Sequence, residues 1–124
     1  MATPSIRARF AQFAPGEALI SDWLTTEVSS ALSSKVRTGA LTPSRRAVAL
    51  TAYQRMFLDD LIVLPVTASD FREAARIADR YDLGLRASDA LHLAIATNHR
   101  ATLLTLDRRL HAAGLALGYA METV

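Results

Sequence analysis

Cysteine is absent from this chain of 124 residues. Its absence excludes disulfide bonds, thiolate catalysis and zinc sites built from cysteine, and it is compatible with a reducing cytoplasm. Lysine is scarce as well, because thirteen of the fourteen basic residues are arginine and Lys35 is the exception. Arginine can bind phosphate through two parallel hydrogen bonds, so a nucleic-acid partner fits this composition, although GC-rich coding produces the same bias.

Long apolar runs, internal repeats and low-complexity segments are also missing. No apolar stretch approaches the roughly 20 residues that cross a membrane, and the start MATPSIRARF lacks the apolar centre of a signal peptide. The chain is long enough to bury a core without disulfides or a structural metal. We therefore expect a single domain over residues 1–124, located in the cytoplasm and without membrane contact.

Apolar residues recur at helical spacing in several segments, and short apolar runs separate these segments. The patterns predict helices over residues 4–13, 22–37, 42–59, 69–81, 87–99 and 107–113, and strands over residues 17–21, 60–67, 101–106 and 119–124. Strands that alternate with helices imply a parallel sheet covered on both faces. The fold class is therefore α/β, a three-layer sandwich.

Details of three helices can also be predicted. Gly39 is expected to end the helix over 22–37, and Thr42 with Pro43 to begin the next one. The strand over 60–67 should be buried. In the helix over 69–81, the residues expected to face the core are Phe71, Ala74, Ala75, Ile77 and Ala78.

Three carboxylates occupy positions at which the packing of a core does not require a charged residue. Asp89 begins an almost wholly apolar helix, Asp107 follows an apolar strand, and Glu27 lies on the edge of an apolar helical face, where it should be partly buried. Asp89 and Asp107 could simply stabilise helix starts, whereas Glu27 is harder to explain structurally. Because ligand sites in parallel sheets form beyond the carboxyl ends of the strands, all three could meet at one rim.

Carboxylates that meet in this way repel one another unless a cation neutralises them. Hard divalent cations prefer oxygen ligands, and Mg²⁺ keeps several waters while contacting substrate phosphate. We therefore expect Mg²⁺ or Mn²⁺ as the cofactor, bound by Glu27, Asp89 and Asp107.

Three blocks of the sequence resemble successive motifs of one family. The blocks SDWLTTEVSSALSSKVRTGAL, GLRASDALHLAIA and LLTLDRRLHAAGLALG, taken in order, are similar to those of PIN domains, specifically the VapC-type toxins of bacterial toxin–antitoxin systems. The resemblance implies a metal-dependent endoribonuclease. It makes Glu27, Asp89 and Asp107 the catalytic and metal-binding residues, with Ser21 and Thr105 at flanking polar positions.

The resemblance also implies partners. A VapC-type toxin cleaves RNA, forms a homodimer and is held inactive by a cognate antitoxin, whose tail commonly places an arginine in the acidic pocket. Arg86, Arg108 and Arg109 lie beside the carboxylates in the sequence and could guide the RNA backbone. Each of these arginines could equally be a solvated surface residue, or an ion-pair partner of Asp82 or Asp89.

The sequence departs from the family at its N-terminus. Members open with a short apolar strand that ends in an aspartate, and this first strand, central in the sheet, has no counterpart here. Asp22 is the only aspartate before Glu27, and it follows the wrong strand to replace the missing ligand. A truncated sequence, a rearrangement or a borrowed segment could each account for the gap, which would otherwise leave backbone groups unpaired.

Two functions therefore remain open from the sequence. The first is a Mg²⁺-dependent ribonuclease of the VapC type, from which we expect little or no activity in the chain as written, since a central ligand is lost. The alternative is a non-catalytic PIN remnant that keeps an antitoxin-binding or dimerising surface.

Overall fold

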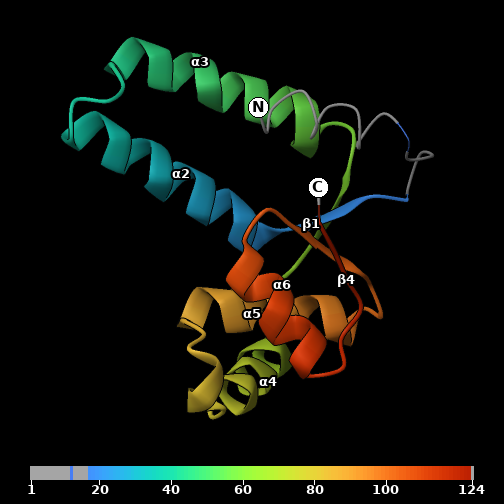
Figure 1. The fold of residues 1–124 in the computed structure, drawn as a ribbon. Helices are drawn as coiled ribbons and strands as arrows, with labels where there is room; N and C mark the ends of the chain where they lie inside the picture. The colour runs from blue at the N-terminus through green and yellow to red at the C-terminus, as the bar shows by residue number, and fades with distance from the viewer. Residues whose placement is uncertain (1–11, 13–16, 124) are drawn as a thin grey trace. The chain divides into compact units, whose positions relative to one another are not determined.

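The computed structural model describes residues 12 and 17–123, and these form two compact units. The N-terminal unit, Gln12–Pro65, contains β1 (Leu19–Ser21), α2 (Asp22–Arg37), α3 (Pro43–Tyr53), the π-helical turn η1 (Gln54–Leu58) and β2 (Ile62–Leu64). The C-terminal unit, residues 66–123, contains α4 (Ala68–Ala78), the 3₁₀ turn η2 (Tyr81–Leu83), α5 (Ala87–Asn98), β3 (Leu103–Thr105), α6 (Arg108–Ala116) and β4 (Met121–Thr123) (Figure 1). The helix predicted over residues 4–13 lies almost entirely outside the described residues.

The order and type of the predicted elements are confirmed from residue 17 onward, and the strands are parallel as expected. They pair two by two: β1 pairs with β2, and β3 pairs with β4. This is a mixed α/β fold, mostly helical, with short parallel strands. A three-layer sandwich around one sheet stays a prediction. In the part of the chain that is described, no helix is long and apolar enough to cross a membrane.

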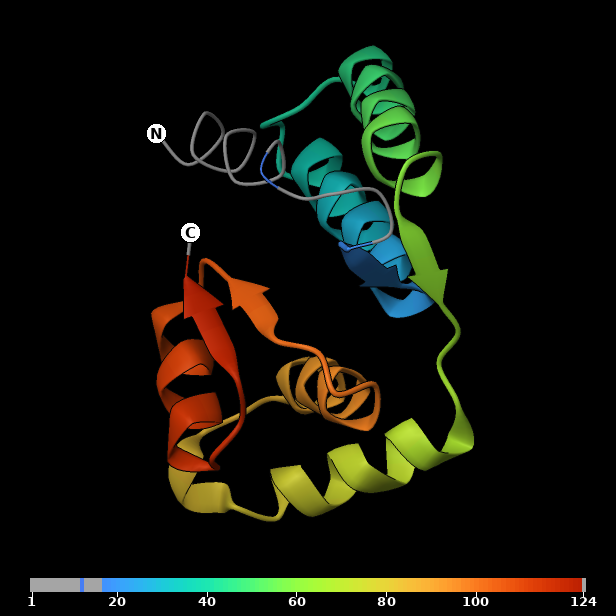
Figure 2. The ribbon, with the colours of Figure 1, turned by 90° about the vertical axis from the view of Figure 1, so that its right-hand side faces the viewer.

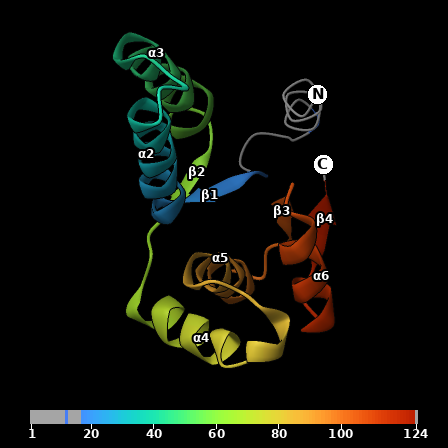
Figure 3. The ribbon, with the colours of Figure 1, turned by 60° about the vertical axis from the view of Figure 1, so that its left-hand side comes forward.

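In the N-terminal unit, α2 and α3 form an antiparallel pair of helices beside the β1–β2 pair (Figures 1 and 3). Gly39 has a φ of 81° and ends α2, as its position predicted, because a left-handed residue there lets the next N–H groups bond back to the last turn. Thr42 accepts a hydrogen bond from the Arg45 N–H at 3.2 Å, and Pro43 is the first residue of α3. Both predicted helix ends are confirmed.

Polar side chains join α2 to α3. Arg46 Nη2 donates to Ser33 Oγ at 3.0 Å and to Ser29 Oγ at 3.2 Å, and the hydroxyls of Tyr53 and Thr25 lie 3.0 Å apart. These contacts set how the two helices pack. β2 is shorter than the predicted strand, and the prediction that it is buried is wrong, because Ile62 is 47% exposed.

The core of the C-terminal unit is α5. Its buried residues are Ala90, Leu91, Leu93, Ala94 and Ile95. Helix α4 packs against α5 and crosses it (Figure 2), and its residues Ala74 and Ile77 are buried as predicted. Phe71, Ala75 and Ala78 are exposed instead, because α4 buries one narrow line of residues spaced three and four apart rather than a wide face.

On the other side of this core, α6 packs against β3 and β4 (Figures 2 and 3). Gly114 of α6 is buried, and a methyl group at its Cα would overlap the Met121 side chain of β4. The absence of a side chain at Gly114 thus allows the close approach of helix and strand.

Asp70, near the start of α4, is a carboxylate with only 1% exposure. It accepts hydrogen bonds from Asn98 Nδ2 of α5 at 2.6 Å and from the Thr67 N–H at 2.9 Å, and Thr67 Oγ1 accepts from the Asp70 N–H. Burial alone would raise the pKa of Asp70, but the hydrogen bonds from Thr67 and Asn98, with the charge of His99, hold the pKa below its ordinary value. Asp70 therefore joins the start of α4 to the end of α5 as a charged group.

Substitution of Asp70 should be costly. We expect Asp70→Asn to lower the free energy of unfolding at pH 7 by about 2 kcal/mol, since a buried hydrogen bond to a charged group is lost. The pKa of Asp70 is lower in the folded protein than in the unfolded chain. Its stabilising effect is therefore fully present above the unfolded-state pKa, and it is lost as the pH falls through the folded-state pKa. The difference between the two proteins in urea unfolding should therefore shrink below about pH 4.

Asp79→Asn, at the exposed C-terminal end of α4, is the matched control. It should change the unfolding free energy by less than about 0.5 kcal/mol. Equal effects of the two substitutions would contradict the role given to Asp70.

Candidate functional site

Asp89 lies in the first turn of α5 and is half-buried. Its Oδ2 accepts a hydrogen bond from the Arg86 N–H, just before the helix, at 3.2 Å. A negative charge here stabilises the helix start, where the N–H groups carry partial positive charge. The structural role that the sequence allowed for Asp89 is therefore real.

Asp107 is the N-cap residue of α6. Its Oδ1 accepts from the N–H groups of Arg109 at 2.9 Å and Leu110 at 3.1 Å. Its own N–H donates to Thr105 Oγ1 at 3.0 Å, so the flanking hydroxyl at the end of β3 sets the turn into α6. Asp107 is thus held rigidly at the carboxyl end of β3.

Capping occupies only one oxygen of each carboxylate. Asp89 Oδ1 and Asp107 Oδ2 accept no hydrogen bond from the residues that the structure describes. A carboxylate anchored through one oxygen keeps the other available for a cation, and its orientation is already set. Capping and metal binding are therefore compatible roles for both residues.

The two aspartates line one cleft of about 250 Å³ in the C-terminal unit. Its lining residues are Leu83, Gly84, Leu85, Arg86, Asp89, Asp107, Arg109 and Leu110. Two carboxylates and two guanidinium groups thus share a small, partly apolar space, and their formal charges cancel. A bound divalent cation would make the cleft positive and attractive to phosphate.

Gly84 shapes one wall of this cleft. Its φ of 65° is left-handed, and a Cβ atom at this position would lie 3.2 Å from Arg109 Nη2. Glycine therefore permits both the turn and the approach of the Arg109 side chain. The sequence did not predict that Leu83, Gly84 and Leu85 line the cleft. The available signal was Gly84, because glycine is typical of a left-handed turn.

The predicted arginines divide into two groups. All three are exposed, but only Arg86 and Arg109 line the cleft with the aspartates, and Arg108 does not. The alternative that one of them pairs with Asp82 is wrong, since Asp82 pairs with Arg80 at 3.1 Å.

Glu27 and Ser21 belong to the N-terminal unit. Glu27 is half-buried on α2, as predicted, and Ser21 caps this helix by accepting from the Leu24 N–H at 3.3 Å. Ser21 and Thr105 thus act alike, each setting a turn from a strand into a helix. The meeting of Glu27 with Asp89 and Asp107 stays a prediction.

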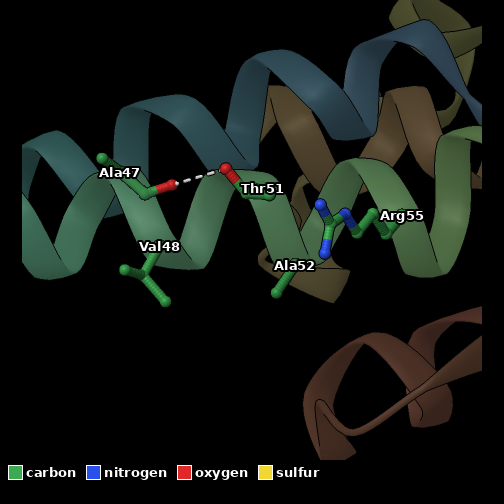
Figure 4. A pocket seen from close by; sticks show the side chains of 5 residues that line it. All are labelled: Ala47, Val48, Thr51, Ala52 and Arg55. Carbon is green, nitrogen blue, oxygen red and sulfur yellow. Dashed lines mark hydrogen bonds between the residues drawn. The ribbon is translucent and has the colours of Figure 1, made fainter.

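A hollow of about 370 Å³ lies along α3 and η1, lined by Ala47, Val48, Thr51, Ala52 and Arg55. Thr51 Oγ1 donates to the Ala47 carbonyl at 3.1 Å, which satisfies the hydroxyl within the helix (Figure 4). The lining holds no carboxylate, and its one hydroxyl, that of Thr51, is bonded within the helix, so the cleft with Asp89 and Asp107 is the better candidate on chemical grounds.

The donor set of the cleft fits Mg²⁺ or Mn²⁺. Mg²⁺ is often bound through one or two carboxylates together with substrate phosphate and water. Asp89 and Asp107 supply two such carboxylates. Within the described residues, no group of three or more His, Asp or Glu side chains is close enough to hold a metal ion.

The two roles of Asp107 can be separated by substitution. Asn caps helices nearly as well as Asp, so Asp107→Asn should leave the free energy of unfolding within about 0.5 kcal/mol of the wild type. Asp107→Ala removes the cap and should cost about 1 kcal/mol. Urea unfolding measures both, and equal losses in the two variants would contradict the capping role.

Comparison with known families identifies the family of this chain. The family model of the PIN domain matches residues 4–115, which include parts of both units and all three predicted acidic residues. A comparison with curated proteins finds no match. PIN domains are generally nucleases, which typically use divalent metals, and this chain belongs to the PIN domain family.

Proposed function

We propose that this chain is a metal-dependent endoribonuclease of the VapC type, the toxin of a toxin–antitoxin pair. The observation that carries the proposal is the cleft in which Asp89 and Asp107, each anchored through one oxygen, lie with Arg86 and Arg109. Carboxylates for a metal and guanidinium groups for phosphate are the two requirements of metal-assisted phosphodiester cleavage.

The residues of the cleft have separate roles in this proposal. Asp89 and Asp107 hold Mg²⁺ or Mn²⁺, and the backbone N–H groups that bind one oxygen of each keep the carboxylates oriented without substrate. Bound there, the metal would activate a water and neutralise charge on the scissile phosphate. Arg86 and Arg109 bind phosphate oxygens, and Arg108, outside the lining, attracts the RNA backbone through its charge.

Glu27 is the third carboxylate of the proposed site. It is half-buried on α2, and Ser21 caps the start of that helix. Residues 17–123 contain no counterpart of the family's first strand or of the aspartate that ends it. We therefore expect metal binding to be weak and cleavage by the chain alone to be slow.

The same proposal includes partners. A cognate antitoxin would place an arginine beside Asp89 and Asp107, because a charge-assisted hydrogen bond to a carboxylate replaces the missing metal. A homodimer is the proposed assembly, and RNA cleavage would take place in the cytoplasm.

Slow cleavage is measurable when the protein is in excess over a labelled tRNA. We expect cleavage that requires Mn²⁺ or Mg²⁺, stops on chelation, and is lost in both Asp89→Asn and Asp107→Asn, because each variant lacks one metal-binding carboxylate. Arg86→Gln should still cleave, more slowly, with a rate that falls less steeply as salt rises, because the variant makes one phosphate contact fewer.

Asp79→Asn is a matched control, because it removes an exposed carboxylate outside the cleft lining. Cleavage that survives both cleft substitutions would contradict the proposal. Complete absence of metal-dependent cleavage, together with tight binding of an antitoxin, would support the non-catalytic binding module instead. That second function is favoured by one observation, which is that helix capping already accounts for both aspartates.

A further inference from the structure

Helix α3 packs within its own unit on one side only. Toward α2, Arg46 Nη2 donates to the hydroxyl oxygens of Ser29 at 3.2 Å and Ser33 at 3.0 Å. On its outer side, Val48 and Ala52 extend away from α2 (Figure 4), and Val48 is 69% exposed. An apolar helix face that its own unit leaves in water is a candidate contact for another protein chain.

This outer face of α3 and η1 is also hollowed. The hollow of about 370 Å³ is lined by Ala47, Val48, Thr51, Ala52 and Arg55. Met56 of η1, next to the lining, is 40% exposed. Because the alanine and threonine side chains are short, a second helix can approach this face as closely as packed helices do.

Charged residues at the two ends of the outer face narrow the choice of partner. Arg45 lies seven residues before Ala52, and Asp59 lies seven residues after it, followed by Asp60. All three charged residues are exposed, and none of them forms an ion pair with another residue that the structure describes. A helix laid across Ala52 therefore meets a positive charge at one end of the face and two negative charges at the other.

The outer face of a second copy of this chain matches this charge pattern. If two copies lie antiparallel about a twofold axis near Ala52, Arg45 of each copy comes beside Asp59 and Asp60 of the other, about 10 Å from the axis. The exposed Val48 side chains then pack into the hollow from both sides. The outer face is thus complementary to itself in charge as well as in shape.

The N-terminal segment of the same chain is a poor match for the hollow. Residues 1–16 contain Arg7 and Arg9 and no acidic residue. They would add positive charge beside Arg45 and Arg55 and would leave the two aspartates unneutralised.

We propose that the outer face of α3 and η1 pairs with the same face of a second copy, antiparallel, about a twofold axis near Ala52. The inference rests on the homodimer in the proposed function and adds the surface that forms it. Two helices of this length make a small interface, so we expect a dimer that dissociates at micromolar concentrations.

Sedimentation velocity over a range of micromolar concentrations tests the proposal. The wild type should form dimers, and Val48→Lys should dimerise about tenfold or more weakly, because it brings a lysine into the apolar contact near Arg55 of the other copy. Phe71→Lys is the matched control, since Phe71 is 54% exposed but lies in the C-terminal unit, and it should dimerise like the wild type. Far-UV circular dichroism checks that both variants are folded.

An exchange of charges tests the antiparallel arrangement. Arg45→Glu alone, and Asp59→Lys with Asp60→Lys, should each dimerise about fivefold or more weakly than the wild type, because like charges meet at both ends. An equal mixture of these two variants should form a mixed dimer of nearly wild-type affinity, because opposite charges then meet at both ends. Glutamate near the N-cap Thr42 and lysines near a helix end are favourable locally, so both variants should stay folded.

Three results would overturn the inference: a wild type that stays monomeric, equal effects of Val48→Lys and Phe71→Lys, or a mixture that does not restore the dimer. A monomeric wild type would leave the hollow to a helix of another protein. Dimers that depend on Val48, without metal-dependent cleavage, would support the inference and contradict catalysis. Cleavage by a monomer that depends on Asp89 and Asp107 would do the opposite.

Discussion

Backbone N–H groups at the starts of α5 and α6 hold the two carboxylates on which the site depends. The N–H of Arg86 binds one oxygen of Asp89, and the N–H groups of Arg109 and Leu110 bind one oxygen of Asp107. A helix start offers unpaired donors in a fixed direction. Each aspartate is therefore oriented by the fold itself.

The rest of the C-terminal unit supports this arrangement. Helix α5 is its apolar core, and Asp70 joins the start of α4 to Asn98 at the other end of α5. The segment between α4 and α5 then has to turn sharply, which η2 and the left-handed Gly84 achieve. That same turn supplies a wall of the cleft, so the packing of α4 on α5 and the shape of the cleft depend on one short segment.

Local signals explain why much of the fold could be predicted from the sequence. Helix α2 spans Asp22–Arg37 as predicted, because Ser21 caps its start and Gly39 follows its end. Asp89 and Asp107 were predicted to lie together from their positions at a helix start and after a strand, and both line one cleft. Burial was harder to predict, since the exposure of Ile62 and Phe71 depends on which elements pack against them, not on spacing along the chain.

The wall of the cleft, formed by Leu83, Gly84 and Leu85, could not be predicted from the sequence for a related reason. Its shape depends on backbone hydrogen bonds within η2 and on the Arg80–Asp82 ion pair, and such contacts have no periodic signature. The pairing of the strands, two by two, likewise depends on contacts between distant segments. Residue types therefore predicted the two aspartates that line the cleft but not the wall beside them.

The central claim, which is a proposal, is that Asp89 and Asp107 together bind one divalent cation. A titration with Mn²⁺, in which binding is measured as the loss of the electron paramagnetic resonance signal of the free ion, tests it directly. We predict one Mn²⁺ bound per chain, with affinity lowered about tenfold or more in Asp89→Asn and Asp107→Asn, and unchanged in Asp79→Asn. No bound Mn²⁺ in the wild type, or equal binding by all the variants, would contradict the claim.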